Sequence, residues 1–240
     1  MKIRNRVFVK DHLEKGMTLT LDQRAAHYLF NVLRCQEDEY ISIFNESTEW
    51  LSKIDKINSK DVQISIEKNI KTADKRKDTT LYFSPIKKNQ TELVIQKCTE
   101  IGVTNFQPVL MERTNFSSFN IDRLSLIAIE AIEQSEQMKI PNIFEPIKFE
   151  ELLSRDQKDH ITLVCSVGEN NNSIKNVLKN NSASNYSLLV GPEGDFSEAE
   201  MNNLKNKGNY FTVSLGDSVL KSETASIVAA GILKDCLQND

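Results

Sequence analysis

Short apolar runs and longer amphipathic segments alternate along the chain from residue 79 to its end. The apolar runs have the length and composition of buried strands, and the segments between them repeat apolar residues at helical spacing. Strands that alternate in this way with helices predict an α/β fold with a parallel sheet and helices on both faces. The predicted strands are TLYFSPI, FQPVL, ITLVCSV, SLLVG and YFTVSL, and the predicted helices cover about 89–101, 121–138, 173–180, 197–206 and 222–237.

The first 70 residues follow a different pattern, in which short runs alternate apolar and polar residues. Such runs predict strands with one buried face, and a single helical pattern interrupts them at 22–34, behind the capping candidate Asp22. Segment 70–80 is charged and lacks apolar periodicity, which is typical of a linker. We therefore expect a small β-barrel with one helix over residues 1–72 and an α/β domain over residues 73–240.

Composition excludes several classes of protein. Hydrophobic residues make up 39% of the chain and charged residues 27%, which indicates a folded protein rather than a disordered one. The longest apolar run, at 225–233, is about half the ~20 residues that cross a bilayer, and the N-terminus lacks a signal-peptide pattern. We expect a cytoplasmic protein with no membrane partner. The four cysteines and three histidines are scattered, which predicts neither a disulfide framework nor a metal site.

The stretch LVGPEGDFSEAE, residues 189–200, places a Gly-Pro-Glu-Gly turn between a predicted strand and a predicted helix. Ser197 and Glu200 form a capping-box pattern at the start of that helix. In parallel sheets, ligands bind where the strands end. This turn is therefore a candidate for a binding site.

The turn fits a phosphate ligand badly. Glycine-rich turns of this kind can bind phosphates, but the P-loop and dinucleotide-binding patterns are missing, and Glu193 and Asp195 would repel phosphate. An acidic turn better suits a ligand with cationic or hydroxyl groups. The alternative is an ordinary turn in which Gly191 and Gly194 supply unusual backbone angles.

A second strand end carries SLGDSVLKSETASIVAA, residues 214–230. Gly216 ends the strand, and Ser222 is placed to cap the helix that follows. The helix is rich in small residues, which allow close approach of another backbone. Because the carboxyl ends of parallel strands meet at one edge of a sheet, these two glycine turns together predict a small-molecule pocket lined by backbone.

Several motifs resemble those of one known family. GPEG followed by DFS, the segment LGDSVLKSETA and the segment HYLFNVLR resemble the 16S ribosomal RNA uracil-N3 methyltransferase family, RsmE. The similarity continues through NRVFV, SPIKK, IQKCTEIGV, PVLMERT and AIEQSEQMKIP, so it covers nearly the whole chain. The resemblance implies a SPOUT-class homodimer with an N-terminal PUA-like RNA-binding barrel (1–72) and a C-terminal methyltransferase domain containing a trefoil knot (73–240).

The resemblance also implies S-adenosylmethionine as the methyl donor, without a metal. Its pocket would lie at the ends of the last three long strands, where backbone groups hold the adenine and ribose. The acidic rim is compatible with the sulfonium and ammonium groups of this cofactor. The implied cofactor-binding residues are Cys165, Ser166, Gly191, Glu193, Gly194, Ser214, Leu215, Gly216 and Leu220.

Methylation of uracil N3 requires removal of its proton and stabilisation of the resulting negative charge. The catalytic candidates for anion stabilisation are Arg113 and Lys221. The candidates for the proton acceptor are Glu193 and Glu223. Glu223 has the alternative role of complementing the dipole at its helix start, and Arg113 that of pairing with an RNA phosphate.

The chain departs from the family pattern at positions that would hold the target. Most relatives carry an arginine at one of the two positions of Ser218 and Val219, and another at the position of Lys221. Many also carry a basic residue in place of Gln137. Lys221 keeps the positive charge but lacks the two-pronged geometry of arginine.

RNA contacts are expected mainly at phosphates, which position the RNA without specifying its sequence. The first ten residues carry four basic groups and no acidic one, although a solvated chain end would look the same. Alternatives are a solvated charge at a helix end for Arg34 and a structural role for His27. The RNA-binding candidates are Arg4, Arg6, His27, Arg34, Lys87, Lys88 and Arg113. The target uracil would be splayed out, because Watson–Crick pairing blocks N3.

Three hypotheses follow for the function. The leading one is methylation of a uridine N3 in 16S ribosomal RNA, with the assembled small ribosomal subunit as the expected partner. A nearer rival is a SPOUT methyltransferase that acts on transfer RNA or on another ribosomal RNA base. The third is a non-catalytic RNA-binding or ribosome-assembly protein, motivated by the missing arginine at position 218 or 219.

Overall fold

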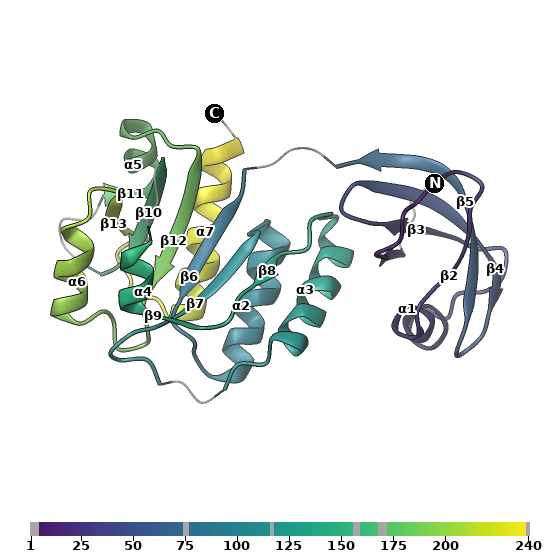
Figure 1. The fold of residues 1–240 in the computed structure, drawn as a ribbon, viewed down its shortest axis with the longest axis horizontal. Helices are drawn as coiled ribbons and strands as arrows, with labels where there is room; N and C mark the ends of the chain where they lie inside the picture. The colour runs from purple at the N-terminus through teal and green to yellow at the C-terminus, as the bar shows by residue number, and fades with distance from the viewer. Residues whose placement is uncertain (1–4, 74–76, 116–117, 156–158, 168–171, 239–240) are drawn as a thin grey trace. The chain divides into compact units, whose positions relative to one another are not determined.

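The computed structural model describes residues 5–73, 77–115, 118–155, 159–167 and 172–238. The chain divides into two compact units (Figure 1). The first, N-terminal unit consists of Met1–Lys75 together with Ile132–Ile140, and the second of Arg76–Ala131 together with Pro141–Asp240. A short segment from the middle of the chain thus returns to the N-terminal unit, which the predicted division at residues 72 and 73 did not anticipate.

The N-terminal unit is a five-stranded mixed sheet in the order β1-β3-β4-β5-β2. β1 pairs with β3 in parallel, and the other neighbouring strands are antiparallel. Alternate residues such as Ile41, Ile43 and Ile64 point into one buried cluster, as the sequence pattern predicted. Within the described residues β1 and β2 do not pair, so the sheet is not closed into the predicted barrel. The strands are β1 (Arg6–Phe8), β2 (Thr18–Thr20), β3 (Tyr40–Phe44), β4 (Thr48–Ile57) and β5 (Val62–Thr72).

The helix predicted at 22–34 changes its geometry halfway. Its first part, α1 (Gln23–His27), is capped by Asp22, whose side chain accepts a hydrogen bond of 2.8 Å from a first-turn N–H. The second part is a π-helix, η1 (Tyr28–Val32). Arg34 follows with a φ of 55°, a left-handed backbone conformation that ends the helix. Apolar periodicity did not reveal this change, because α-helical and π-helical turns both bury one side.

Arg6 lies inside the N-terminal unit. Its side chain is 7% exposed and bonds Glu49 through two nitrogens, at 2.8 Å from Nε and 3.0 Å from Nη2. Nη1 donates at 2.8 Å to the carbonyl of Ile132, in the returning segment. The guanidinium carbon lies 4.0 Å from the centre of the Phe44 ring. These protein partners occupy the guanidinium, so the expectation that Arg6 contacts RNA is corrected to a structural role.

The second unit contains a parallel sheet in the order β11-β13-β10-β12-β6-β7-β8, with β9 paired to β7. The pairs are all parallel, as the strand-helix alternation predicted. The two-residue strands β8, β9 and β11 are too short to show a sequence pattern. The predicted trefoil knot stays a prediction. The strands are β6 (Thr79–Phe83), β7 (Asn105–Leu110), β8 (Asn142–Ile143), β9 (Ile147–Lys148), β10 (His160–Cys165), β11 (Asn172–Ser173), β12 (Asn185–Val190) and β13 (Tyr210–Ser214).

Helices cover both faces of this sheet. Leu81, Phe106 and Leu188 point to the face packed by α2, α3, α5 and α7. Tyr82 and Leu189 point to the other face, packed by α4 and α6, because side chains alternate along a strand. None of the described helices is long and apolar enough to cross a membrane. The helices are α2 (Lys88–Ile101), α3 (Ile121–Ser135), α4 (Phe149–Ser154), α5 (Ile174–Asn180), α6 (Glu198–Lys205) and α7 (Ser222–Gln238).

A chain of polar side chains joins the starts of β10 and β12. Nε2 of His160 lies 2.8 Å from the Ser187 hydroxyl, which lies 2.9 Å from the Thr162 hydroxyl. Burial lowers the pKa of His160 below its ordinary value of 6.5. The folded state therefore disfavours the charged imidazolium.

We expect His160 to make the protein less stable in mild acid. Because its folded-state pKa lies below the unfolded value of 6.5, the unfolded chain binds the proton first as pH falls. The contribution of neutral His160 to the free energy of unfolding is thus fully present above pH 6.5. It is lost as pH falls from there towards the folded-state pKa. Urea unfolding followed by circular dichroism is measured at about pH 7.5 and about pH 5.5. The free energy of unfolding should fall more between these two pH values for wild type than for His160→Gln. Equal losses would contradict this assignment.

Candidate functional site

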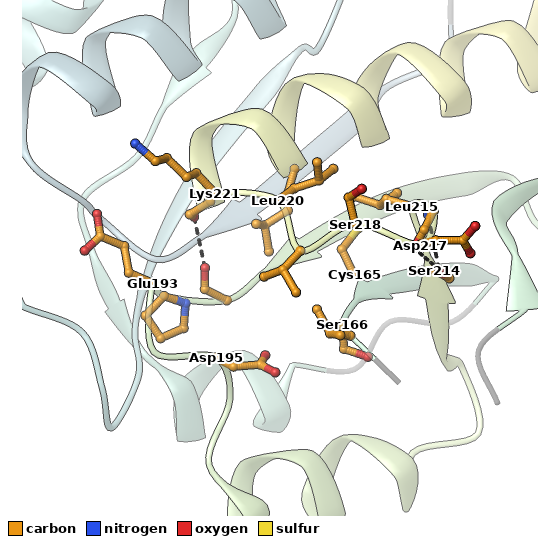
Figure 2. Close-up of a pocket in the computed structure, with 18 residues that line it drawn as sticks. Cys165, Ser166, Glu193, Asp195, Ser214, Leu215, Asp217, Ser218, Leu220 and Lys221 are labelled. Carbon is orange, nitrogen blue, oxygen red and sulfur yellow. Dashed lines mark hydrogen bonds between the residues drawn. The ribbon is translucent and has the colours of Figure 1, made fainter. Parts of the chain in front are cut away.

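A pocket of about 990 Å³ lies where three strands of the parallel sheet end. Its lining includes the last residues of β10, β12 and β13, which are Cys165, Val190 and Ser214. The start of α7 contributes Ser222 and Ala225. Figure 2 shows the side chains of these segments around the pocket. The pocket is at the carboxyl edge of the sheet, where the sequence predicted it.

Close neighbours explain the glycines of the Gly-Pro-Glu-Gly turn. A Cβ on Gly191 would lie 3.0 Å from the Phe196 ring, and one on Gly194 would lie 3.3 Å from Cδ of Arg113. The turn closes through a 2.9 Å hydrogen bond from the Asp195 N–H to the carbonyl three residues earlier. Asp195 itself has the left-handed φ, 60°, whereas neither glycine of the turn has a positive φ. The alternative of unusual backbone angles at these two glycines is therefore wrong.

Helix α7 is tied to this turn through its first residue. The Ser222 hydroxyl donates a 3.0 Å hydrogen bond to the carbonyl of Gly191, and both residues are buried. Ser222 was expected to cap its own helix, but its hydroxyl joins the two loops of the pocket. On another wall, the Ser214 hydroxyl bonds the N–H and carbonyl of Gly216 at 3.2 and 3.1 Å. Gly216 has a φ of 127°, which only glycine adopts easily.

The charged side chains that line the pocket are mainly acidic. They are Glu193, Asp195 and Asp217, with Lys221 as the basic one. Glu193 and Lys221 lie at the same end of the pocket, and Asp217 lies at the opposite end (Figure 2). Within the described part of the chain, the Lys221 ammonium has no hydrogen-bond or ion-pair partner. A ligand with positive and hydroxyl groups suits this lining better than a phosphate ester.

Cys165 contributes a small apolar wall to the pocket. Burial raises the pKa of its thiol to about 12. The thiol therefore stays protonated near neutral pH and does not act as a nucleophile. The described residues also contain no group of three or more His, Cys, Asp or Glu placed to hold a metal ion.

The structure gathers most of the predicted cofactor residues around this pocket. Those that line it are Cys165, Ser166, Gly191, Glu193, Ser214, Leu215, Gly216 and Leu220. Gly194 belongs to the turn but faces Arg113 instead. Sequence reasoning missed Val167, Val190, Pro192, Asp195, Asp217, Ser222 and Ala225 as lining residues, and it named Ser218 and Val219 only as departures from the family. The missed residues lie within a few positions of predicted ones, so including the whole loop after each of β10, β12 and β13 would have found them.

The catalytic candidates separate into two groups. Glu193 and Lys221 line the pocket, whereas Arg113 and Glu223 do not. Glu223 is half-buried in the first turn of α7, a position that suits its dipole-complementing alternative. Arg113 is exposed beside the pocket, and its Nη1 donates a 2.6 Å hydrogen bond to the carbonyl of Gly194.

The RNA-binding candidates other than Arg6 are all exposed where the structure describes them. His27 and Arg34 are exposed in the N-terminal unit. Lys87 and Lys88 are exposed at the start of α2, just after β6, on the same sheet edge as the pocket. Arg4 lies outside the described residues.

Comparisons with known proteins identify relatives over nearly the whole chain. A family model described as an RNA methyltransferase domain matches residues 73–234, and one described as an RNA methyltransferase PUA domain matches residues 21–67. Ribosomal RNA small subunit methyltransferase E from Rickettsia conorii is 30% identical, over 94% of this chain and 93% of the relative. The protein of that name from Aquifex aeolicus is 27% identical, over 95% and 98%. The crystal structure of ribosomal RNA small subunit methyltransferase E from Neisseria gonorrhoeae, bound to S-adenosyl methionine, has a TM-score of 0.87 and 25% identity and covers 96% of this chain and 97% of its own.

Proposed function

The chain belongs to the ribosomal RNA small subunit methyltransferase E family, and from this we propose that it methylates N3 of a uridine in 16S ribosomal RNA with S-adenosylmethionine as donor. The observation that carries the proposal is the pocket at the ends of β10, β12 and β13. It lies inside the segment matched by the RNA methyltransferase domain. The uridine N3 position rests on the family resemblance.

The lining of the pocket fits S-adenosylmethionine. The turns at Gly191 and Gly216 present main-chain groups, which can bind an adenine and a ribose without charged side chains. The acidic residues Glu193, Asp195 and Asp217 favour the positive groups of the cofactor. When bound, the cofactor supplies a methyl group activated by its sulfonium.

Within this pocket we assign anion stabilisation to Lys221. Deprotonation of uracil N3 creates a negative charge, and the Lys221 ammonium, which has no partner among the described residues, is available to stabilise it. Glu193 lies at the same end of the pocket and is the proposed proton acceptor (Figure 2). The other candidate, Glu223, does not line the pocket, so we assign it to the dipole of α7. Arg113, beside the Gly-Pro-Glu-Gly turn, is assigned to RNA contact.

Gly191→Ala should weaken cofactor binding about tenfold, because the added methyl group would lie 3.0 Å from the Phe196 ring and displace the turn. Titration calorimetry with S-adenosylmethionine measures the change. Gly208→Ala is the matched control, since nothing lies within 4 Å of its added Cβ, and it should bind as wild type does. Equal affinity of Gly191→Ala and wild type would remove this turn from the cofactor site.

A transfer assay tests the proposed function against both rivals. The protein is incubated with methyl-labelled S-adenosylmethionine and either small ribosomal subunits lacking the modification, free 16S ribosomal RNA, or transfer RNA. Label in ribosomal RNA is the expected result. Label in transfer RNA alone would favour the related methyltransferase, and cofactor binding without transfer to any RNA would favour a non-catalytic protein.

The proposal includes the setting in which the protein acts. We propose a homodimer that acts in the cytoplasm on the assembled small subunit, as the family resemblance implies. Light scattering during size-exclusion chromatography measures the mass in solution. A mass of one chain, 27.3 kDa, at working concentrations would contradict the dimer.

A further inference from the structure

The loop after β7 forms a tight turn of its own. The Met111 N–H donates a 2.8 Å hydrogen bond to the Thr114 hydroxyl oxygen, and the Thr114 N–H donates at 3.0 Å to the Met111 carbonyl. The Thr114 hydroxyl also lies 2.7 Å from that of buried Ser84, which follows β6. These contacts fix both ends of the turn. Glu112 and Arg113 are its two central residues.

Glu200 connects this turn to α6. Its side chain is buried, although it belongs to the first helical turn of α6. Oε2 accepts a 2.9 Å hydrogen bond from the Ser197 N–H and so completes the predicted capping box. Oε1 accepts a 2.8 Å hydrogen bond from the Glu112 N–H, 88 positions earlier in the chain. The bond from the Ser197 N–H is enough to complete the capping box. The bond from the Glu112 N–H in addition links α6 to the turn after β7.

The link between Glu112 and Glu200 holds the next residue, Arg113, in place. Its backbone is held next to the bond with Glu200, and its guanidinium is held by the 2.6 Å bond to the Gly194 carbonyl. Gly194 and Glu200 belong to the same turn-helix segment, so the neighbouring residues Glu112 and Arg113 are together fixed to that segment at two points. The Cδ of Arg113 would lie only 3.3 Å from a Cβ on Gly194, which shows how closely its side chain crosses the turn.

We propose that Glu200 is a positioning residue, which holds the Arg113 guanidinium beside the Gly-Pro-Glu-Gly turn for contact with the RNA substrate. This inference rests on the proposed function, because it is through RNA contact that Arg113 contributes to the reaction. The Glu200 carboxylate accepts two backbone hydrogen bonds, from the Glu112 N–H at Oε1 and from the Ser197 N–H at Oε2. Glutamine has one oxygen and one NH2 group, so Glu200→Gln places a donor against a donor and loses one of the two bonds.

A double-mutant cycle with Arg113 tests the proposal. Glu200→Gln should lower kcat/KM for ribosomal RNA about tenfold and leave the Kd for S-adenosylmethionine within about twofold. In an Arg113→Ala background the same substitution should change kcat/KM by less than about twofold, because the group that Glu200 positions is gone. An equal loss in both backgrounds would overturn the proposal.

Ser197→Ala is the matched control. It removes the 3.3 Å bond from the Glu200 N–H to the Ser197 hydroxyl but leaves both acceptor bonds of the Glu200 carboxyl. This variant should lower Tm while keeping kcat/KM within about twofold of wild type. If Glu200 served only as a helix cap, Ser197→Ala and Glu200→Gln would reduce activity alike, and that result would also overturn the proposal.

A second readout separates this inference from the proposed function. Hydrogen exchange at the Glu112 amide should become at least about tenfold faster in Glu200→Ala, which removes both carboxylate oxygens, and stay unchanged in Ser197→Ala. This measurement needs no activity. If the wild-type protein transfers no methyl group, the proposed function is wrong. The double-mutant cycle of Glu200 and Arg113 would then be measured by affinity for 16S ribosomal RNA. Unchanged exchange at the Glu112 amide in Glu200→Ala, or affinity losses independent of Arg113, would overturn the positioning role.

Discussion

Lys221→Met should lower kcat for methyl transfer about a hundredfold while leaving the Kd for S-adenosylmethionine within about threefold of wild type. The reason is that Lys221 is the basic side chain lining the pocket and has no protein partner among the described residues. Its backbone is anchored, because its carbonyl accepts a 2.8 Å hydrogen bond from the Ala225 N–H in α7. Methionine keeps the length of the side chain and removes its charge. Single-turnover kinetics with saturating cofactor measures the effect.

Two further variants control for this result. Lys221→Arg introduces the arginine that the family resemblance implies at this position, and it should retain most of the activity because the charge remains. Lys207→Met removes an exposed lysine of the same unit that does not line the pocket, and it should leave kcat unchanged. Activity of Lys221→Met within about twofold of wild type would show that another group stabilises the anion.

Arg6→Ala should destabilise the N-terminal unit by about 3–5 kcal/mol, because it leaves the Glu49 carboxylate buried without its positively charged partner. Burial alone would raise the pKa of Glu49, but hydrogen bonds from Arg6 and Ser42 outweigh it and hold the pKa below the ordinary 4.5. The substitution also frees the Ile132 carbonyl, which ties the returning segment to the sheet. The buried Glu49 carboxylate and the Ile132 carbonyl thus lose their bonds to Arg6 at once.

Denaturant unfolding followed by Trp50 fluorescence measures this loss, since the chain's one tryptophan lies in β4. Arg6→Ala/Glu49→Ala should be less destabilised than the sum of the single variants, because the unpaired charge is gone. Lys53→Ala breaks an exposed ion pair in the same strand and should change stability little. If Arg6→Ala unfolds like wild type and instead loses RNA affinity, the original RNA assignment would be right.

The sequence predicted most of the fold because long periodic segments carry strong signals. The parallel strands, their helices, the Asp22 cap and the Ser197 capping box are all present. The sequence did not show that the described five-stranded sheet is open between β1 and β2, since strand pairing depends on partners far apart in the chain. The return of 132–140 to the N-terminal unit depends in part on Arg6, 126 positions before Ile132, and no local pattern encodes such a distance.

The pocket could be predicted for a similar reason. Its loops follow strand ends that the sequence marks with Gly191 and Gly216, so their meeting followed from parallel topology. Individual roles were harder to infer. Arg6 was assigned to RNA from charge alone, although burial beside Glu49 determines its role. Glu200 was read as a helix cap, since its bond to Glu112 spans 88 positions.

Mass spectrometry of 16S ribosomal RNA tests the central claim most directly. Small subunits lacking the modification are incubated with the protein and S-adenosylmethionine carrying a deuterated methyl group, and the RNA is then digested to nucleosides and to oligonucleotides. We predict labelled N3-methyluridine at one position, with the label strongly reduced for Lys221→Met. Label on another base or another atom of uridine, or no label in 16S ribosomal RNA, would contradict the claim.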